Sequence, residues 1–376
     1  MKDAKLSRHL ERKAHDFYAA CVNHLAPVDV LTEDDLPLPR MLTEGGCETL
    51  DCGLEGSFYK RVEHIHNTVA YEPVRSFALE DVHVAGDQGF IYKGARRMVA
   101  VCEEVGRIPR DKVRRPIRWL RRCVEAPVFH LTGNNHESHG HFVLQHLPRL
   151  MAVRERLLDK PEVKLLLAPG HMHWQRFYLE RLGFGPERLL EGTPGTLHCR
   201  QLEYVPFYNV CGNLVDRRTY RKMSAQLTRG AVSSRELYLF LSRKGSRHRS
   251  LLNEDDVLHA CQELWPKMQR VELQDYSPVG QVELFRNSRV IFGPHGQAFT
   301  NLIYTRDALA IIASASRVIG GWSASFRNLA LQMGGTGLVL TADVPGWKNM
   351  DHWEYPMDRL RTQLDRLQEL LPDKYR

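Results

Sequence analysis

The sequence predicts an α/β protein with a doubly wound parallel sheet in its C-terminal half. From about residue 215 onward, short apolar runs alternate with amphipathic segments of helical length. Strands of one parallel sheet that are connected by helices give this order of elements. The runs are continuously apolar, which is typical of strands whose sheet is covered by helices on both faces. The expected strands are residues 237–241, 270–273, 290–292, 309–312 and 338–340.

Helix-start signals separate these strands. Asn253 precedes three acidic residues, which is the pattern of an N-cap followed by an acidic first turn. Ser277 precedes Pro278, and proline fits the first position of a helix. The expected helices of this half are residues 253–264, 278–287, 297–304 and 323–333, and residues 357–371 also have helical spacing.

The first 214 residues show weaker patterns. Strand-like segments at 163–167 and 202–205 and an amphipathic stretch at 174–182 suggest a second α/β layer. Residues 142–157 are expected to form a helix that is interrupted at Pro148. The expected domains are an N-terminal lobe, a C-terminal lobe and a final helix that packs back on the N-terminal lobe. Their bounds are residues 1–214, 215–345 and 346–376, and residues 1–125 match no pattern that we recognise.

Composition limits the class of protein. The chain has 376 residues, of which 43% are hydrophobic and 26% charged, so it has enough apolar residues for two domain cores. No apolar run reaches the ~18–20 residues that cross a bilayer, and the first residues lack the apolar core of a secretory signal. The eight cysteines form no C-x-x-C pair and no N-x-Ser/Thr sequon occurs. A cytoplasmic protein with free thiols is therefore expected.

The net charge of +7 is concentrated between Lys93 and Arg122, where basic residues far outnumber acidic ones. A basic surface of this kind attracts anionic membrane headgroups or an acidic glycan. Nucleic acid is not expected as a partner, because neither interleaved aromatic residues nor a nucleic-acid motif accompanies the basic segment. The structural alternative is a solvated helix face.

Two strand ends of the C-terminal half carry the residues of an anion site. Strand 237–241 is followed by Ser242 and Arg243, and strand 290–292 is followed by Gly293-Pro-His295-Gly296. Backbone N–H groups and positive helix ends would converge at this edge of a parallel sheet. The glycines allow the backbone to approach a ligand closely. The sequence therefore predicts a phosphate-binding site at this edge.

The same segments resemble glycosyltransferase family 61, whose pattern is approximately Y-L-S-R, R, N-E, E-Q-V and H-G-A-G-L-T-N. The pattern occurs here, in the same order, at residues 238–243, 249, 253–254, 280–282 and 295–301. Gln297 and Phe299 depart from the small and apolar residues of the family. Upstream, residues 141–150 resemble the family segment H-W-L-L-D-x-L-P-R-L. The resemblance covers about residues 130–345.

The resemblance implies a GT-B-like fold, with two Rossmann-like lobes that face each other across a cleft. It implies a UDP-sugar donor bound by the C-terminal lobe and a glycan acceptor bound by the N-terminal lobe, with inversion at the anomeric carbon. Xylose and N-acetylglucosamine are the sugars expected from the family. The implied donor-binding residues are Ser242, Arg243, Arg249, Asn253, Glu254, Gln281, Gly293, His295, Gly296, Thr300 and Asn301. Most eukaryotic relatives have a membrane anchor, so a bacterial or viral member is expected.

No metal or other cofactor is expected. The diphosphate leaving group gains negative charge as the glycosidic bond breaks, and Arg243, Arg249 and the N–H groups after His295 can stabilise that charge. No D-x-D pair occurs between residues 130 and 305 to hold a bridging cation. Five histidines between residues 130 and 146 suggest a zinc site as an alternative, but the segment from His136 to His139 misses the H-E-x-x-H spacing by one residue.

The general base is the least determined part of the expected site. The family pattern places an aspartate four residues after its first histidine, and Gln145 occupies that position here. An amide is not a base, so His141 is the first candidate and Glu137 the second. Two of these residues also have a structural alternative. Glu254 could serve only to stabilise the N-terminus of its helix, and His141 could serve only to hold its loop through a hydrogen bond. Gln145 also leaves open a non-catalytic sugar-nucleotide or glycan-binding module, or another nucleotide-sugar enzyme such as an epimerase.

Overall fold

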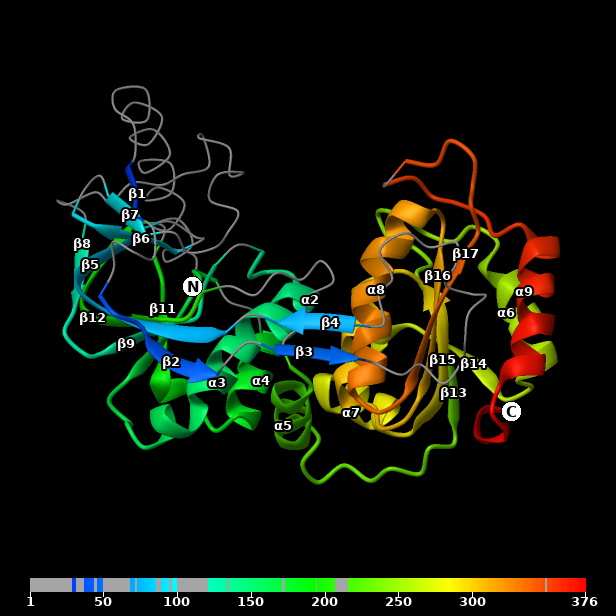
Figure 1. Cartoon of the computed structure of the whole chain (residues 1–376), viewed down its shortest axis with the longest axis horizontal. Helices are drawn as coiled ribbons and strands as arrows, with labels where there is room; N and C mark the ends of the chain where they lie inside the picture. The colour runs from blue at the N-terminus through cyan, green and yellow to red at the C-terminus, as the bar shows by residue number, and fades with distance from the viewer. Residues whose placement is uncertain are drawn as a thin grey trace. The chain divides into compact units, whose positions relative to one another are not determined.

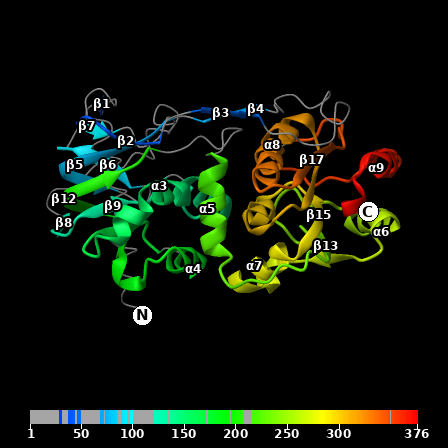
Figure 2. The ribbon, with the colours of Figure 1, turned by 60° about the horizontal axis from the view of Figure 1, so that its bottom comes forward.

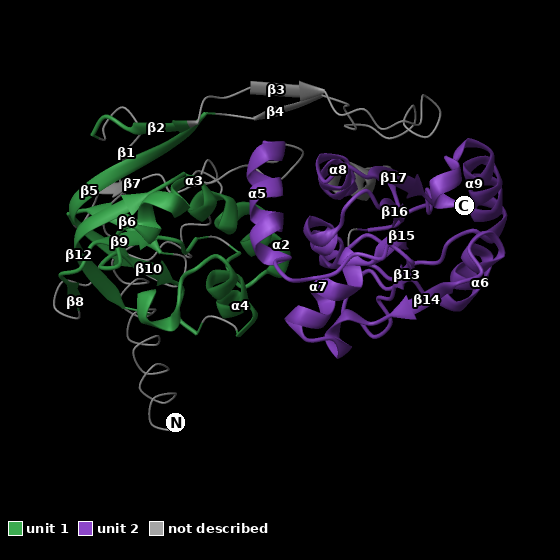
Figure 3. Cartoon of the chain, turned by 90° about the horizontal axis from the view of Figure 1, so that it is seen from below, with its two compact units in different colours: residues 1–46, 72–209 green, residues 47–71, 210–376 purple. Residues whose placement is uncertain are grey.

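The computed structural model describes residues 29–31, 37–43, 46–49, 68–71, 73–85, 89–94, 97–99, 121–133, 135–170, 173–193, 195–206, 216–348 and 350–376. The chain divides into two compact units (Figure 3). Unit 1 consists of Met1–Gly46 and Glu72–Asn209, and unit 2 of Cys47–Tyr71 and Val210–Arg376.

Unit 2 contains a five-stranded sheet in the order β14-β13-β15-β16-β17, and all of its pairs are parallel. In chain order this is 2-1-3-4-5, one of the two common doubly wound orders. Helix α8 lies on one face of the sheet, and helices α6 and α9 lie on the other (Figure 1). The parallel sheet predicted for this half is confirmed. Its strands are β13 (Leu237–Leu241), β14 (Met268–Val271), β15 (Ser288–Pro294), β16 (Leu309–Ser314) and β17 (Thr336–Thr341).

Three α-helices of unit 2 lie close to their predicted positions: α6 (Glu254–Leu264), α7 (Pro278–Arg286) and α9 (Met357–Leu370). Helix α8 (Arg317–Gln332) begins earlier than the predicted start at residue 323, and α5 (Arg217–Leu227) was not predicted. Ser277 caps α7 as expected, because its hydroxyl accepts the Gly280 N–H. Asn253 takes the N-cap position of α6 as predicted, but its side chain forms no capping hydrogen bond. The Asn253 amide instead donates to the Tyr355 carbonyl and accepts the Tyr355 N–H, two backbone hydrogen bonds that take the place of one cap bond.

Residues 297–304 form a 3-10 helix, η8 (Gln297–Tyr304), where the sequence predicted an ordinary helix. Residues three apart lie above one another in a 3-10 helix. Phe299 and Leu302 have this spacing, and both are fully buried. The tighter winding therefore places both side chains in the core. Two shorter 3-10 turns are η7 (Leu273–Asp275) and η9 (Asp373–Tyr375).

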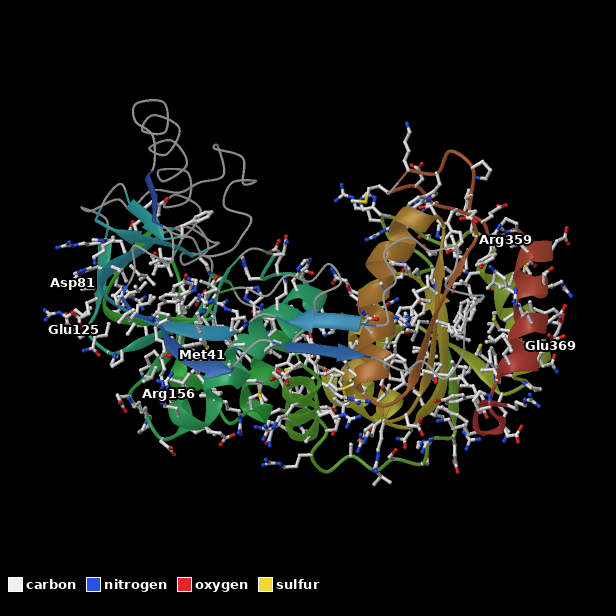
Figure 4. All side chains as sticks on the ribbon, viewed as in Figure 1. Met41, Asp81, Glu125, Arg156, Arg359 and Glu369 are labelled. Atoms are coloured by element: carbon white, nitrogen blue, oxygen red, sulfur yellow. The ribbon has the colours of Figure 1, made fainter. Side chains whose placement is uncertain are left out.

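Helix α9 packs within unit 2. Its buried residues Leu360, Leu364 and Leu367 belong to the same core cluster as Phe240 of β13 and Phe292 of β15. Burial of each leucine contributes roughly 1.5–3 kcal/mol. Arg359, labelled in Figure 4, fixes the start of the helix by donating to the Thr341 carbonyl and to Asp343. The sequence analysis expected this helix to pack back on the N-terminal lobe, whereas its apolar face is used in the core of its own unit.

Unit 1 contains a ten-stranded mixed sheet in the order β1-β7-β6-β5-β12-β9-β10-β11, with β2 paired to β5 and β8 paired to β12. Pairs among β12, β9, β10 and β11 are parallel, but β5 is antiparallel to β12, β6 and β2. This sheet differs from the Rossmann-like sheet expected for the N-terminal lobe. The strands are β1 (Asp29–Leu31), β2 (Arg40–Thr43), β5 (Val74–Ala85), β6 (Phe90–Lys93), β7 (Arg97–Val99), β8 (Arg121–Val124), β9 (Val128–His130), β10 (Lys164–Leu167), β11 (Leu189–Glu191) and β12 (Thr196–Tyr204). A separate two-stranded sheet pairs β3 (Gly46–Thr49) with β4 (Thr68–Tyr71).

The helical segment after β9 runs without a break through Pro148. It consists of α2 (His139–His141), a π-helical turn η5 (Phe142–His146) and α3 (Leu147–Leu158). The interruption predicted at Pro148 is wrong, because the helical winding continues from η5 into α3 with Pro148 as the second residue of α3. The irregularity comes earlier, as the π turn, a feature frequent at functional sites. Unit 1 also contains α4 (His173–Arg181) and a short turn η6 (Pro186–Arg188).

Most of the basic segment from Lys93 to Arg122 lies outside the described residues. Lys93, Arg121 and Arg122 are described, and all three are exposed. Within the described part of the chain, no helix combines the length and the apolar character needed to cross a bilayer. Cys123, Cys199 and Cys261 are free thiols.

Candidate active site

The candidate site of unit 2 lies where β13 and β15 end. These strands are neighbours in the sheet, although β14 lies between them in the sequence (Figure 2). From β13 the chain continues to β14 on one side of this pair, and from β15 it continues to β16 on the other side. In doubly wound sheets the crevice outside the carboxyl ends of such strands is the usual ligand position. Arg243 follows β13 at this point, and His295 follows β15.

Arg243 is held by its own loop. Its guanidinium donates to the His248 carbonyl at 2.9 Å, and its main-chain N–H donates to Oε2 of Glu254 at 3.2 Å. Nε is buried and has no hydrogen-bond partner. Burial, and then the nearby Arg249, lower the pKa of Arg243 to about 10, while Glu254 opposes the shift. The group therefore keeps its charge at neutral pH and retains a buried donor that no described residue satisfies.

Arg249 places a second guanidinium beside the first. Its backbone lies in the left-handed region at φ 57°, which costs a non-glycine residue on the order of 1 kcal/mol. Its Nε is also buried without a hydrogen-bond partner, and burial lowers the pKa of the group. Two half-buried cations side by side are unfavourable unless an anion lies between them. The pair is therefore suited to a multiply charged anion such as a diphosphate.

His295 and Gly296 complete this edge. The His295 N–H donates to the Ala313 carbonyl at 2.8 Å, and its Nδ1 lies 2.8 Å from the Ser323 hydroxyl. Burial, then Arg249 and Arg243, lower the pKa of His295 to about 3, so the ring is neutral at pH 7. A Cβ on Gly296 would lie 2.0 Å from Nη1 of Arg243. Only glycine lets the guanidinium lie this close to the backbone at the start of η8.

The other residues predicted to bind a donor divide into two groups. Three already have protein partners: Ser242 accepts the Lys244 N–H, Asn253 binds the Tyr355 backbone, and Glu254 binds the Arg243 N–H. The second oxygen of Glu254 lies 3.4 Å from Nε of Arg270. These contacts hold the loop around Arg243, and they are consistent with supporting roles.

Thr300 and Asn301 have buried polar atoms that lack partners. Thr300 Oγ1 and Asn301 Oδ1 are both without a hydrogen bond. The Asn301 amide donates to Gln281, which itself donates to the carbonyls of Leu273 and Tyr276. Unpaired buried polar atoms are costly in a protein interior. A bound ligand or water that reached these two atoms would remove that cost.

The second candidate site lies in unit 1. Nδ1 of His141 lies 2.6 Å from Oε1 of Gln145, one helical turn later. An amide oxygen accepts hydrogen bonds, so this contact fits the tautomer with the ring proton on Nδ1. Glu137 is 62% exposed and pairs with His136 at 3.4 Å. Both predicted base candidates therefore lie in the segment that leads into the π turn.

The remaining histidines of this segment have separate structural partners. They contact Gly89 (His130), Gly133 (His136), Tyr178 (His139) and Leu131 (His146). Burial lowers the pKa of His130 to about 3, with Arg149 adding to the shift, and burial lowers the pKa of His139 to about 4. Among the residues that the structure describes, no three His, Cys, Asp or Glu side chains converge as a metal site.

The structure brings Arg243, Arg249, His295 and Gly296 together. Sequence reasoning missed Arg270 and Ser323. Ser323 was expected at a helix start, but no spacing signal connects it with a histidine 28 residues upstream. Arg270 was assigned only as a strand residue, and its contact with Glu254 depends on the neighbouring positions of β13 and β14.

Comparison with known proteins gives one result. Residues 139–312 match the family model described as Glycosyltransferase 61. The match runs from α2 through β16 and so includes His141, Arg243, Arg249 and His295. It confirms the resemblance noted from the sequence. A search of curated proteins found no match.

Proposed function

Because residues 139–312 belong to glycosyltransferase family 61, we propose that this protein is an inverting glycosyltransferase that uses a UDP-sugar. The acceptor in this proposal is a hydroxyl of a glycan, and the sugar is xylose or N-acetylglucosamine. The supporting observation is the pair of guanidinium groups, Arg243 and Arg249, whose Nε donors are buried without partners at the carboxyl edge of the sheet. Family membership by itself points to glycosyltransferase activity.

In the proposed reaction, unit 2 stabilises the leaving UDP. As the bond between the anomeric carbon and the β-phosphate oxygen breaks, negative charge grows on the diphosphate. Arg243 and Arg249 supply fixed positive charge, and the first N–H groups of η8 supply donors. Two guanidinium groups provide what a divalent cation provides in metal-dependent transferases. The proposal is therefore a metal-independent transfer.

His141 is the proposed general base. Its Nε2 takes the proton from the acceptor hydroxyl while that oxygen attacks the anomeric carbon opposite the UDP, which inverts the configuration. The Gln145 amide fixes the tautomer that leaves Nε2 unprotonated. Gln145 thus performs the orienting part of a carboxylate's role, without its negative charge. Glu137 is the second candidate.

Ligand binding gives the first prediction. A UDP-sugar at 100 times its Kd is expected to add about 2.7 kcal/mol to the stability of the wild type, in EDTA as well as in magnesium. Arg243→Ala is expected to lose this shift, and Arg218→Ala, which removes an exposed arginine of α5, to keep it. The measurement is a thermal-shift panel of UDP, GDP and CMP sugars. Stabilisation by GDP or CMP compounds alone, or only with magnesium, would contradict the proposed donor or the metal-independent mechanism.

The glycine positions give a second prediction. Gly296→Ala is expected to weaken UDP binding tenfold or more with little change in Tm, because the displaced Arg243 guanidinium is the end of a flexible side chain. Gly293→Ala is expected to lower stability by about 1–3 kcal/mol, because its Cβ would lie 2.8 Å from the Leu241 carbonyl oxygen, which belongs to a central strand. Calorimetric titration with UDP and thermal unfolding of both variants separate the two effects. Equal Tm losses would show that Gly296 is a packing position.

Gln145 also supports a second candidate function, a non-catalytic sugar-nucleotide or glycan-binding module. In that case the base would be absent and the donor site would serve recognition only. UDP release measured across a panel of glycan acceptors distinguishes the two functions. Stabilisation by a UDP-sugar without turnover on any acceptor would favour the binding module, and acceptor-dependent UDP release would exclude it.

A further inference from the structure

Ser323 of α8 lies directly against the candidate donor site. Its hydroxyl is 2.8 Å from Nδ1 of His295, and the serine is fully buried. Phe326, one turn further along the same helix, packs against the His295 ring with 5.6 Å between the ring centroids. Ser323 and Phe326 lie outside the region that matches the family model. Helix α8 therefore holds the imidazole from two positions.

The ring of His295 is neutral, so one of its two nitrogens carries the single ring proton. Burial and the two neighbouring guanidinium groups together disfavour the charged ring. No described residue forms a hydrogen bond with Nε2, and Nδ1 contacts Ser323. The tautomer therefore decides whether Nε2 offers a donor or an acceptor to a ligand bound between Arg243 and Arg249. A donor complements an anionic diphosphate, and an acceptor repels it.

We propose that Ser323 is a positioning residue whose hydroxyl donates to Nδ1 of His295, which leaves the ring proton on Nε2 as a hydrogen-bond donor to the diphosphate. This inference rests on the proposed donor-binding function. A neutral N–H adds a hydrogen bond without placing a third cation beside two arginines, which would be costly in a half-buried site. The histidine thus acts as a donor over the whole range of pH in which the arginines are charged.

The tautomer can be observed directly. The whole chain is labelled with ¹⁵N-histidine, and two-bond ¹H–¹⁵N correlation spectra are recorded for the wild type, Ser323→Ala, Ser323→Thr and the control Ser325→Ala, a buried serine of the same helix. His295→Asn assigns the signals. A pyridine-type Nδ1 and a pyrrole-type Nε2 are expected in the wild type, in Ser323→Thr and in Ser325→Ala, and averaged signals in Ser323→Ala. A protonated Nδ1 in the wild type, or an unchanged pattern in Ser323→Ala, would overturn the inference.

UDP titration tests the consequence for binding. Loss of one oriented donor is expected to weaken UDP binding about threefold to tenfold in Ser323→Ala. Ser323→Thr is expected to restore most of the affinity, because it keeps the hydroxyl, and Ser325→Ala to bind as the wild type does. If the wild type binds UDP and Ser323→Ala binds equally well, the inference fails while the proposed function stands. If the wild type binds no UDP, the proposed function fails, and the spectra still decide the tautomer.

Discussion

Replacing Arg243 with alanine is expected to lower kcat/KM for UDP-sugar transfer by about 10²–10³-fold, the effect of removing one preorganised donor from a developing negative charge. Arg243 is suited to this role because its loop holds it in place through His248 and Glu254, while its Nε has no hydrogen-bond partner among the residues that the structure describes. The substitution also leaves Arg249 as the remaining guanidinium of the pair. Steady-state kinetics with the donor identified by thermal shift is the measurement.

Two further variants make this result specific. Arg243→Lys keeps the charge but loses the planar fork of donors, so it is expected to recover only part of the activity. Arg218→Ala on α5 is the matched control for loss of an arginine, and activity equal to the wild type is expected. If Arg243→Ala retained more than about a third of wild-type kcat/KM with an unchanged Tm, the leaving group would have to be stabilised elsewhere.

Replacing His141 with asparagine is expected to lower kcat by about 10²–10⁴-fold while the affinity for UDP stays unchanged, because a general base acts on the acceptor and not on the nucleotide. The expected signature is a loss in kcat at saturating donor, together with loss of the acidic limb of the pH–rate profile. UDP binding, measured by titration, serves as the control for an intact donor site.

Gln145 offers a graded test of the same mechanism. Gln145→Glu keeps an oxygen acceptor facing Nδ1 of His141, so kcat is expected to be retained. Gln145→Leu removes the oriented acceptor and is expected to lower kcat across the profile. If His141→Asn is fully active and Glu137→Gln is not, Glu137 is the base and the interpretation of His141 is wrong.

Much of unit 2 could be predicted from the amino-acid sequence. The strand expected at 237–241 is β13 to the residue, and the helix expected at 278–287 is α7 with one residue fewer. Continuous apolar runs, the Ser277 cap and Pro278 are local signals, and each acts within a few residues of itself. The meeting of Arg243 and His295 at one edge followed from the same signals, because residues after neighbouring parallel strands lie at the same edge of the sheet.

The N-terminal half could not be predicted in the same way. Strand β12 pairs antiparallel with β5 from Thr196 and Ala85 to Tyr204 and Phe77, more than a hundred residues away in the chain. The direction of such a pairing depends on packing between distant segments and leaves no local pattern. The 3-10 winding of η8 likewise had no signal in the sequence, which predicted an ordinary helix there.

The sequence by itself therefore determined the parallel sheet of unit 2, the edge at which Arg243 and His295 meet, and the resemblance to the family. Local propensity and strand order are sufficient for these features. Only the tertiary structure decided that Asn253 binds the Tyr355 backbone, that α9 fills the core of its own unit, and that Ser323 contacts Nδ1 of His295. Each of these contacts joins residues that are far apart in the chain, and the packing of whole elements brings their atoms within hydrogen-bonding or van der Waals distance.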